Sequence, residues 1–99
     1  MYVIRDVMNC KPGKVGEMVK KFKAMGPVLE RFGQSPMRVM TDVAGEAYWT
    51  VVGEFEVPSL EKFQEVMGAS MQDPEGKKAM EGYHELVMKG RREIFKLES

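Results

Sequence analysis

The sequence predicts an α+β fold: a four-stranded antiparallel sheet covered by helices on one face. Segments rich in β-branched residues occur near the start, in the middle and at the end of the chain, and helical apolar spacing separates them. The expected order is strand, helix, strand, strand, helix, strand, with the second helical region split in two. Because crossover connections are right-handed, both helical regions should lie on the same face. The 99 residues suit a single domain, residues 1–99.

The first half of the chain predicts a strand followed by a long helix. Tyr2–Asn9 alternates as a strand does, and the turn "KPGK" leads into the helix. Gly26–Pro27 should kink or interrupt this helix, and "GQSP" (residues 33–36) should end it. The spacing of one buried face is followed by Val15, Met18, Val19, Phe22, Met25, Leu29 and Phe32.

The middle of the chain predicts a β-hairpin. Met37–Val43 and Ala47–Val57 are the expected strands, and "AGE" (residues 44–46) is the expected tight connection. Pro58–Ser59 then begins a helix whose apolar side chains are Leu60, Phe63, Val66, Met67 and Met71.

The last third predicts another helix and a final strand. Asp73 is the expected N-cap and Pro74 the first helical residue. Gly90 should end the helix before the strand Arg91–Leu97. One stripe of this helix should carry Met80, Tyr83, His84 and Val87. The whole order is that of a ferredoxin-like βαββαβ sandwich.

Strand alternation separates an apolar sheet face from a mixed one. The face expected under the helices holds Tyr2, Ile4, Asp6, Met8, Met37, Val39, Thr41, Val43, Ala47, Trp49, Val51 and Phe55. The opposite face mixes apolar residues with opposite charges, which suits a partner surface better than free exposure. We therefore expect an isologous homodimer through Arg5, Arg38, Tyr48, Thr50 and Glu54.

Asp6 is the exception on the helix-facing side, because an unpaired buried carboxylate is costly. His84, the only histidine, is the candidate partner on the last helix. Three interpretations stay open: the two side chains satisfy each other, Asp6 reaches solvent at the sheet edge, or both line a cleft as an acid–base pair.

A cleft between sheet and helices is the expected binding site for a small apolar ligand, such as an acyl chain or a planar aromatic. Ten methionines in the chain suit flexible walls of this kind. The expected lining is Ile4, Met8, Met18, Phe22, Trp49, Val51, Phe63, Met67, Met80, Tyr83 and Val87. A filled core without a cavity, in a non-catalytic structural dimer, is the competing interpretation.

Composition excludes several other classes. The net charge of zero argues against nucleic-acid binding, and no apolar run has the length of a membrane span. Arg5 and Asp6 interrupt the start where a signal peptide would be apolar, and a single Cys10 fits a reducing cytoplasm. One cysteine and one histidine do not make a structural zinc site, so no metal is expected. Phosphate-loop, dinucleotide and serine-nucleophile motifs do not occur.

The sequence resembles the dimeric α/β-barrel superfamily, and within it NIPSNAP-like and antibiotic-biosynthesis-monooxygenase-like domains. The resemblance rests on the first strand with "KPGK", on "GEFEVPSLEKFQEVM", and on "DPEGKKAM" followed by "RREIF". It implies that two protomers pair their sheets face to face and that ligands bind between helices and sheet. It also implies, as an alternative function, a monooxygenase or isomerase without a bound cofactor, in which His84 is the base and Asp6 orients it.

Heme degradation, another activity in this superfamily, is not expected from the same resemblance. The asparagine of that branch corresponds here to Asp6, counted back from Gly13, and its tryptophan falls near Val66 or Met67. Only the histidine has a counterpart, His84.

Overall fold

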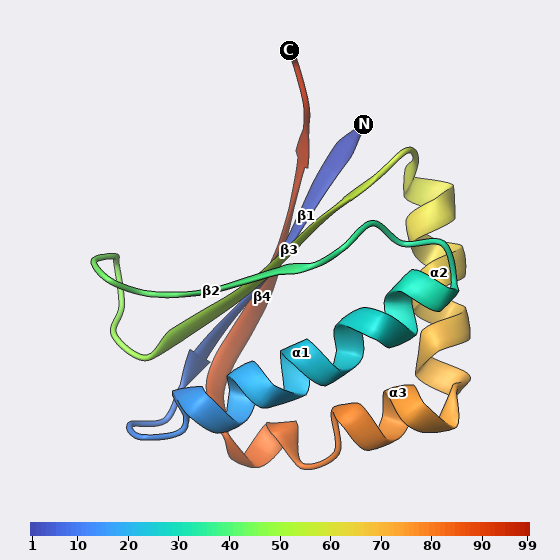
Figure 1. Ribbon diagram of the computed structural model, residues 1–99. Coiled ribbons are helices and arrows are strands. Elements are labelled where there is room, and N and C mark those ends of the chain that lie inside the picture. The colour runs from blue at the N-terminus through green and yellow to red at the C-terminus, as the bar shows by residue number, and fades with distance from the viewer.

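The computed structural model describes residues 1–99 and has the predicted α+β architecture. All helices lie on one side of a four-stranded sheet, and the other side is open (Figure 1). The elements, in chain order, are β1 (Tyr2–Cys10), α1 (Val15–Arg31), β2 (Arg38–Thr41), β3 (Thr50–Val57), α2 (Leu60–Gln72), α3 (Pro74–Ala79), a 3₁₀ turn (Tyr83–Glu85) and β4 (Val87–Lys96). The ferredoxin-like prediction is confirmed.

The strands lie in the order β2-β3-β1-β4, and every neighbouring pair is antiparallel. β1 lies inside the sheet, and each of its residues 2–9 has a partner on both β3 and β4. Asp6 lies opposite Gly53 on β3 and Arg92 on β4. Since directly opposed residues share a face, Asp6 and Arg92 both point toward the helices.

Helix α1 runs through Pro27 without a break, so the predicted interruption is wrong. Pro27 lacks an amide hydrogen and removes one helical hydrogen bond, but the buried face of the helix continues on both sides of it. Met18, Phe22 and Leu29 are buried in that face, as their spacing predicts. Tertiary packing therefore outweighs the local cost of the proline.

The junction between α2 and α3 is fixed by its capping residues. Asp73 accepts a hydrogen bond from the Gly76 amide, and Pro74 is the first residue of α3, as predicted. Arg31 at the end of α1 donates to the same carboxylate over 2.9 Å. Desolvation works to raise the pKa of Asp73, but the bonds from Arg31 and Gly76 outweigh it, so the pKa is lowered. A Cβ atom at Gly76 would clash with the Ser70 carbonyl oxygen, so only glycine permits this close approach.

In the hairpin between β2 and β3, the strands are shorter and the connecting loop is longer than predicted. β2 ends at Thr41 and β3 begins at Thr50, so residues 42–49 form the connection. The Asp42 carboxylate accepts a hydrogen bond from the Thr50 amide over 2.8 Å and closes this loop. Trp49, directly before β3, has a φ of 61°, a left-handed conformation outside the strand region, and it is 45% exposed rather than covered by helices.

The last helix is also shorter than predicted. α3 ends at Ala79, and Gly82 takes a left-handed φ of 78° before the 3₁₀ turn that contains His84. β4 begins at Val87, so Gly90 is a strand residue opposite Met8 and not the helix stop. The glycine that ends the helical region is therefore Gly82, and His84 is exposed rather than on an inward stripe.

The core between sheet and helices forms two clusters. One gathers Cys10, Met18, Phe22, Val51 and Leu86. The other gathers Ile4, Phe55, Val57 and Phe63. Burial raises the pKa of the Cys10 thiol, as expected for a cysteine within an apolar cluster.

Candidate functional site

A cavity of about 360 Å³ lies between the helices and the sheet. β1, β3 and β4 contribute its floor, and all three helices contribute to its walls. Ten of its fifteen lining residues are hydrophobic, Tyr83 with its hydroxyl among them, and the polar side chains of the other five are Asp6, Ser70, Lys77 and Arg92. A mostly apolar hollow with a few polar groups is the usual form of a small-molecule site.

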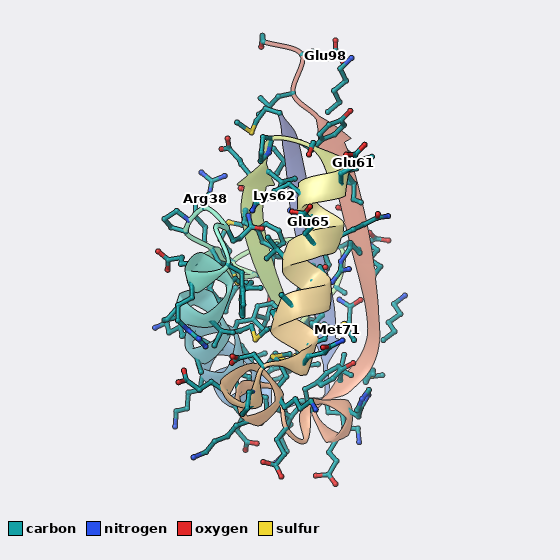
Figure 2. All side chains as sticks on the ribbon, turned by 90° about the vertical axis from the view of Figure 1, so that its right-hand side faces the viewer. Arg38, Glu61, Lys62, Glu65, Met71 and Glu98 are labelled. Carbon is teal, nitrogen blue, oxygen red and sulfur yellow. The ribbon has the colours of Figure 1, made fainter.

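Methionine dominates the apolar lining. Six of the ten methionines of the chain surround the cavity: Met8, Met25, Met37, Met67, Met71 and Met80. Met71 lies at the far end of α2 from Glu61 and is 70% exposed, so the cavity reaches the surface near the α2–α3 junction (Figure 2). Flexible thioether side chains let such walls adapt to ligand shape.

The structure brings only part of the predicted ligand-binding set to this cavity. Met8, Phe22, Met67, Met80 and Tyr83 line it. The others lie elsewhere. Fully or nearly fully buried in the core clusters are Ile4, Met18, Val51 and Phe63.

Two further members of that set lie at other hollows. Val87 packs at the edge of the first core cluster and lines a second depression beside Tyr83. Trp49 is on the long β2–β3 loop, where with Val15 and Tyr48 it lines a separate shallow hollow. The misplaced start of β3 explains why Trp49 was predicted to lie under the helices.

Asp6 has a partner in the structure, and the partner is Arg92. The Arg92 Nε donates to Asp6 Oδ1 over 2.6 Å and Nη2 donates to Oδ2 over 3.3 Å. The Arg92 guanidinium also lies 5.1 Å from the centre of the Phe63 ring. Two directed bonds and a cation–π contact thus hold this arginine in place on the helix-covered face.

His84 forms no hydrogen bond or ion pair with Asp6. Its ring packs on the Tyr83 ring, with centroids 3.9 Å apart. His84, Tyr83 and Asp6 nevertheless line one depression of about 360 Å³, which also contains Arg92. The two residues proposed from sequence as an acid–base pair therefore share a hollow without being in contact.

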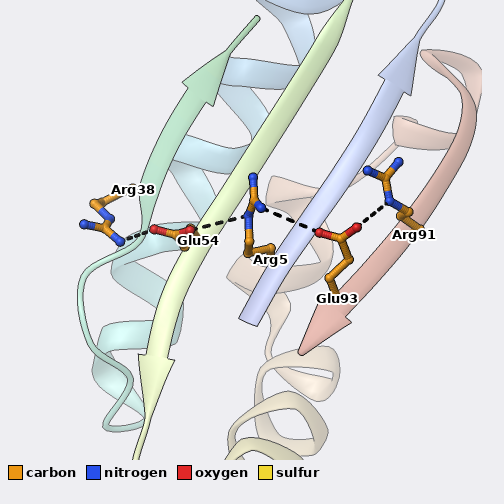
Figure 3. Close-up of polar contacts among 5 residues, drawn as sticks. All are labelled: Arg5, Arg38, Glu54, Arg91 and Glu93. Atoms are coloured by element: carbon orange, nitrogen blue, oxygen red, sulfur yellow. Dashed lines mark hydrogen bonds and ion pairs between the residues drawn. The ribbon is translucent and has the colours of Figure 1, made fainter. Parts of the chain in front are cut away.

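The open face carries a row of alternating charges across all four strands (Figure 3). Arg38 on β2 pairs with Glu54 on β3, whose carboxylate lies 3.4 Å from Arg5 Nε on β1. Arg5 also pairs with Glu93 on β4, which accepts a 2.8 Å hydrogen bond from Arg91. That bond from Arg91 is the main cause of the lowered pKa of Glu93. We call these five residues the ion row.

Of the other two residues predicted for the dimer surface, Thr50 begins β3 and Tyr48 lies on the loop before it. Thr50 Oγ1 accepts a hydrogen bond from the side-chain Nδ2 of Asn9 over 3.1 Å, and the Tyr48 side chain is 85% exposed. The structure has Arg5, Arg38, Thr50 and Glu54 on the open face of the sheet, as the strand alternation predicts, and their role in a dimer stays a prediction.

Sequence reasoning missed several cavity residues, above all Arg92 and Lys77. Arg92 follows the predicted alternation of the last strand, but only the β1–β4 register places it opposite Asp6. That register depends on where β4 begins. Because Gly90 was predicted to end the helix, the start of the strand was placed too late in the sequence. Lys77 looked like one of many solvated helix lysines, and no local signal distinguishes it.

Two other classes of site have no structural counterpart. No three His, Cys, Asp or Glu side chains gather in a way that would hold a metal ion. None of the helices combines the length and apolar character needed to cross a membrane.

The strand order and the one-sided helical layer define a ferredoxin-like α+β domain with a cavity between its layers. No family model matches the sequence, and no curated protein matches it. Solved structures do resemble it. A NIPSNAP domain protein from Burkholderia xenovorans is 15% identical, with a TM-score of 0.83 over 100% of this chain and 96% of that one.

Two NIPSNAP family proteins from Agrobacterium tumefaciens are similar to the same degree. One is 16% identical with a TM-score of 0.79, covering 96% of this chain and 90% of its own. The other, described as of unknown function, is 17% identical with a TM-score of 0.81, covering 98% and 87%. The chain therefore has the fold of NIPSNAP domains, which confirms the resemblance seen in the sequence at the level of the fold.

Proposed function

We propose that this protein binds a small, largely apolar organic molecule, an acyl chain or a planar aromatic, in the cavity between helices and sheet. The observation that carries this proposal is the methionine-rich lining of a cavity that is open to the surface near Met71. Its volume of about 360 Å³ is toward the small end of ligand sites, roughly 300–1,000 Å³.

Two features support a ligand over an unfilled packing defect. Ten of the fifteen residues that line this cavity are hydrophobic, compared with three of eight in the depression of similar volume beside His84. The polar groups Asp6, Arg92 and Tyr83 also lie at the floor and side of the cavity, where they would orient one end of a ligand.

The test is native mass spectrometry of the purified protein, with solvent extraction of any co-purifying molecule. A panel of fatty acids and aromatics should also raise the melting temperature. Met80→Trp, which fills the cavity, should abolish that rise, whereas Met88→Trp, on a side chain 70% exposed and away from the lining, should preserve it. A ligand-free protein whose melting temperature ignores the panel would favour a filled core.

A second copy of the chain is the proposed partner for the open face. The ion row and the exposed Met40 and Phe95 give this face a mixture of charge and apolar surface typical of interfaces. In a dimer with a two-fold axis, the open face of each copy would cover the open face of the other, and both copies would use the same residues.

A catalytic role for His84 with Asp6 is a second proposed function, favoured by the depression that both residues line. A histidine is suited to proton transfer near neutral pH. Oxygen uptake and isomerisation assays with quinol, naphthol and lactone panels should first detect turnover. Loss of the base in His84→Ala should then lower the rate by roughly a hundredfold or more. Equal turnover in both proteins would exclude the histidine from the mechanism.

A further inference from the structure

The charged groups of the cavity are unequal in number. Its lining holds one carboxylate, Asp6, and two cations, Lys77 and Arg92. Asp6 is already bound by Arg92 through two hydrogen bonds. The positive charge of Lys77 therefore has no counterpart in the lining, and the cavity has a surplus of one positive charge.

Hydrogen-bond donors are in surplus as well. A guanidinium carries five N–H donors, and Asp6 accepts from two of them, so three remain on Arg92. Lys77 is an exposed residue of α3 that forms no ion pair or side-chain hydrogen bond, and the carboxylate of Glu75 pairs with Arg31. The Tyr83 hydroxyl forms no hydrogen bond either. The Ser70 hydroxyl already donates to the Met67 carbonyl over 3.1 Å.

Arg92 is positioned before any ligand arrives. Asp6 holds two of its nitrogens, and the Phe63 ring lies 5.1 Å from the guanidinium carbon. A fixed arginine binds a carboxylate with less loss of side-chain entropy than a free one. Asp6 in this role orients the arginine and does not compete for the ligand.

We infer that the ligand is an amphipathic anion, whose apolar body lies among the methionines and whose carboxylate is bound by Lys77 and the free N–H groups of Arg92. This inference rests on the proposed ligand-binding function and adds the charge of the ligand. A ligand with an alcohol head would accept fewer hydrogen bonds from the donors of Lys77 and Arg92. A ligand with an amine head would add a third positive charge to the cavity. Carboxylate, sulfonate and phosphate heads share this anionic chemistry, and a carboxylate suits a cavity of this size.

The test compares three probes that differ only in their head group: dodecanoate, dodecanol and dodecylamine. Their affinities are measured by isothermal titration calorimetry, below the critical micelle concentrations of the two ionic probes and below the solubility limit of dodecanol. Dodecanoate should bind about tenfold more tightly than dodecanol, as expected for charge-assisted hydrogen bonds, and dodecylamine should bind most weakly. Equal, saturable binding of all three probes would overturn the anionic head but preserve the proposed cavity. Binding of none, repeated with the corresponding naphthalene carboxylate, alcohol and amine, would overturn both.

The residue assignment is tested by Lys77→Met, with Lys78→Met as its matched control. Lys78 is the next residue of α3 but lines a different surface depression, beside Glu17 and Lys20. Lys77→Met should weaken dodecanoate about fivefold, as expected for one partly solvated ion pair, and leave dodecanol unchanged. Lys78→Met should change neither affinity. An equal effect of the two substitutions would remove Lys77 from the binding site.

Discussion

The two faces of the sheet use the same chemistry in opposite settings. Arg5 and Asp6 are neighbours on β1 and point to opposite faces, and their partners Glu93 and Arg92 are neighbours on β4. On the open face, Arg5 belongs to a row in which each carboxylate contacts two arginines. On the covered face, Asp6 has one partner among apolar residues. If one arginine of the open face is removed, the carboxylates that it contacted still have another arginine as partner. If Arg92 is removed from the covered face, the Asp6 carboxylate has no partner.

The reversed order of signs also fixes the pairing of β1 with β4. A shift of one residue would place Arg5 opposite Arg92, or Asp6 opposite Glu93. Like charges directly opposed in a sheet are unfavourable. Such a shift would also turn the apolar side chains of β4 to the wrong face. The two charge pairs and the apolar pattern therefore both oppose a one-residue shift, and together they specify the register.

The largest expected difference between the faces concerns apolar packing. Ile4→Ala removes a side chain with 0% exposure and should lower the free energy of unfolding by about 2–5 kcal/mol, because a cavity remains. Val3→Ala, the neighbouring position on the open face, should cost below about 1.5 kcal/mol because Val3 is only half-buried. Urea unfolding with both transitions fitted together measures the difference. Equal losses would mean that the open face is as well packed as the core.

The proposed dimer gives the next effect. Arg38→Glu places a second carboxylate beside Glu54 in the ion row and should weaken dimerisation by roughly 2–5 kcal/mol at most. Sedimentation equilibrium over a range of micromolar concentrations measures the dissociation constant. Lys78→Glu on α3 reverses a charge on the helical side and serves as control. A wild-type protein that remains monomeric at these concentrations would contradict the assignment of the open face.

The fold could be predicted from the sequence because strand and helix periodicities extend over whole elements. Asp73 and Pro74 also marked the start of α3 correctly, since capping is a local property. The boundaries failed where a residue takes a left-handed conformation without an unambiguous signal, at Trp49 and Gly82. The candidate site failed for a different reason. The Asp6–Arg92 pair joins residues at opposite ends of the chain, and strand register determines it.

On the covered face the Asp6 carboxylate has one arginine partner, and on the open face each carboxylate has two. Removing one arginine from each face tests the effect of this difference. Arg92→Met leaves the Asp6 carboxylate, 19% exposed, without its partner and should cost about 1–3 kcal/mol in unfolding free energy. Arg5→Met should cost at most about 1 kcal/mol, because Glu54 keeps Arg38 and Glu93 keeps Arg91. The double variant Asp6→Asn with Arg92→Met should recover part of the loss. Identical costs for the two single variants would show that the row does not compensate.

The smallest expected effect is the pH dependence of the open face, and Glu93 is the residue that reports it. The hydrogen bond from Arg91 lowers the pKa of Glu93 in the folded protein below its value in the unfolded chain. Its stabilising contribution is therefore fully present above the unfolded glutamate pKa of about 4.3, and it disappears as the pH falls through the lower folded value. Glu93→Gln should melt slightly below wild type at neutral pH and match it in strong acid. The gap should also shrink in concentrated salt, because the pair is partly solvated.

Glu98→Gln, in the exposed C-terminal segment, should follow wild type at every pH. Melting curves recorded from neutral to strongly acidic pH decide the matter: a gap between Glu93→Gln and wild type that persists unchanged in acid would show that packing, and not charge, accounts for the contribution of Glu93.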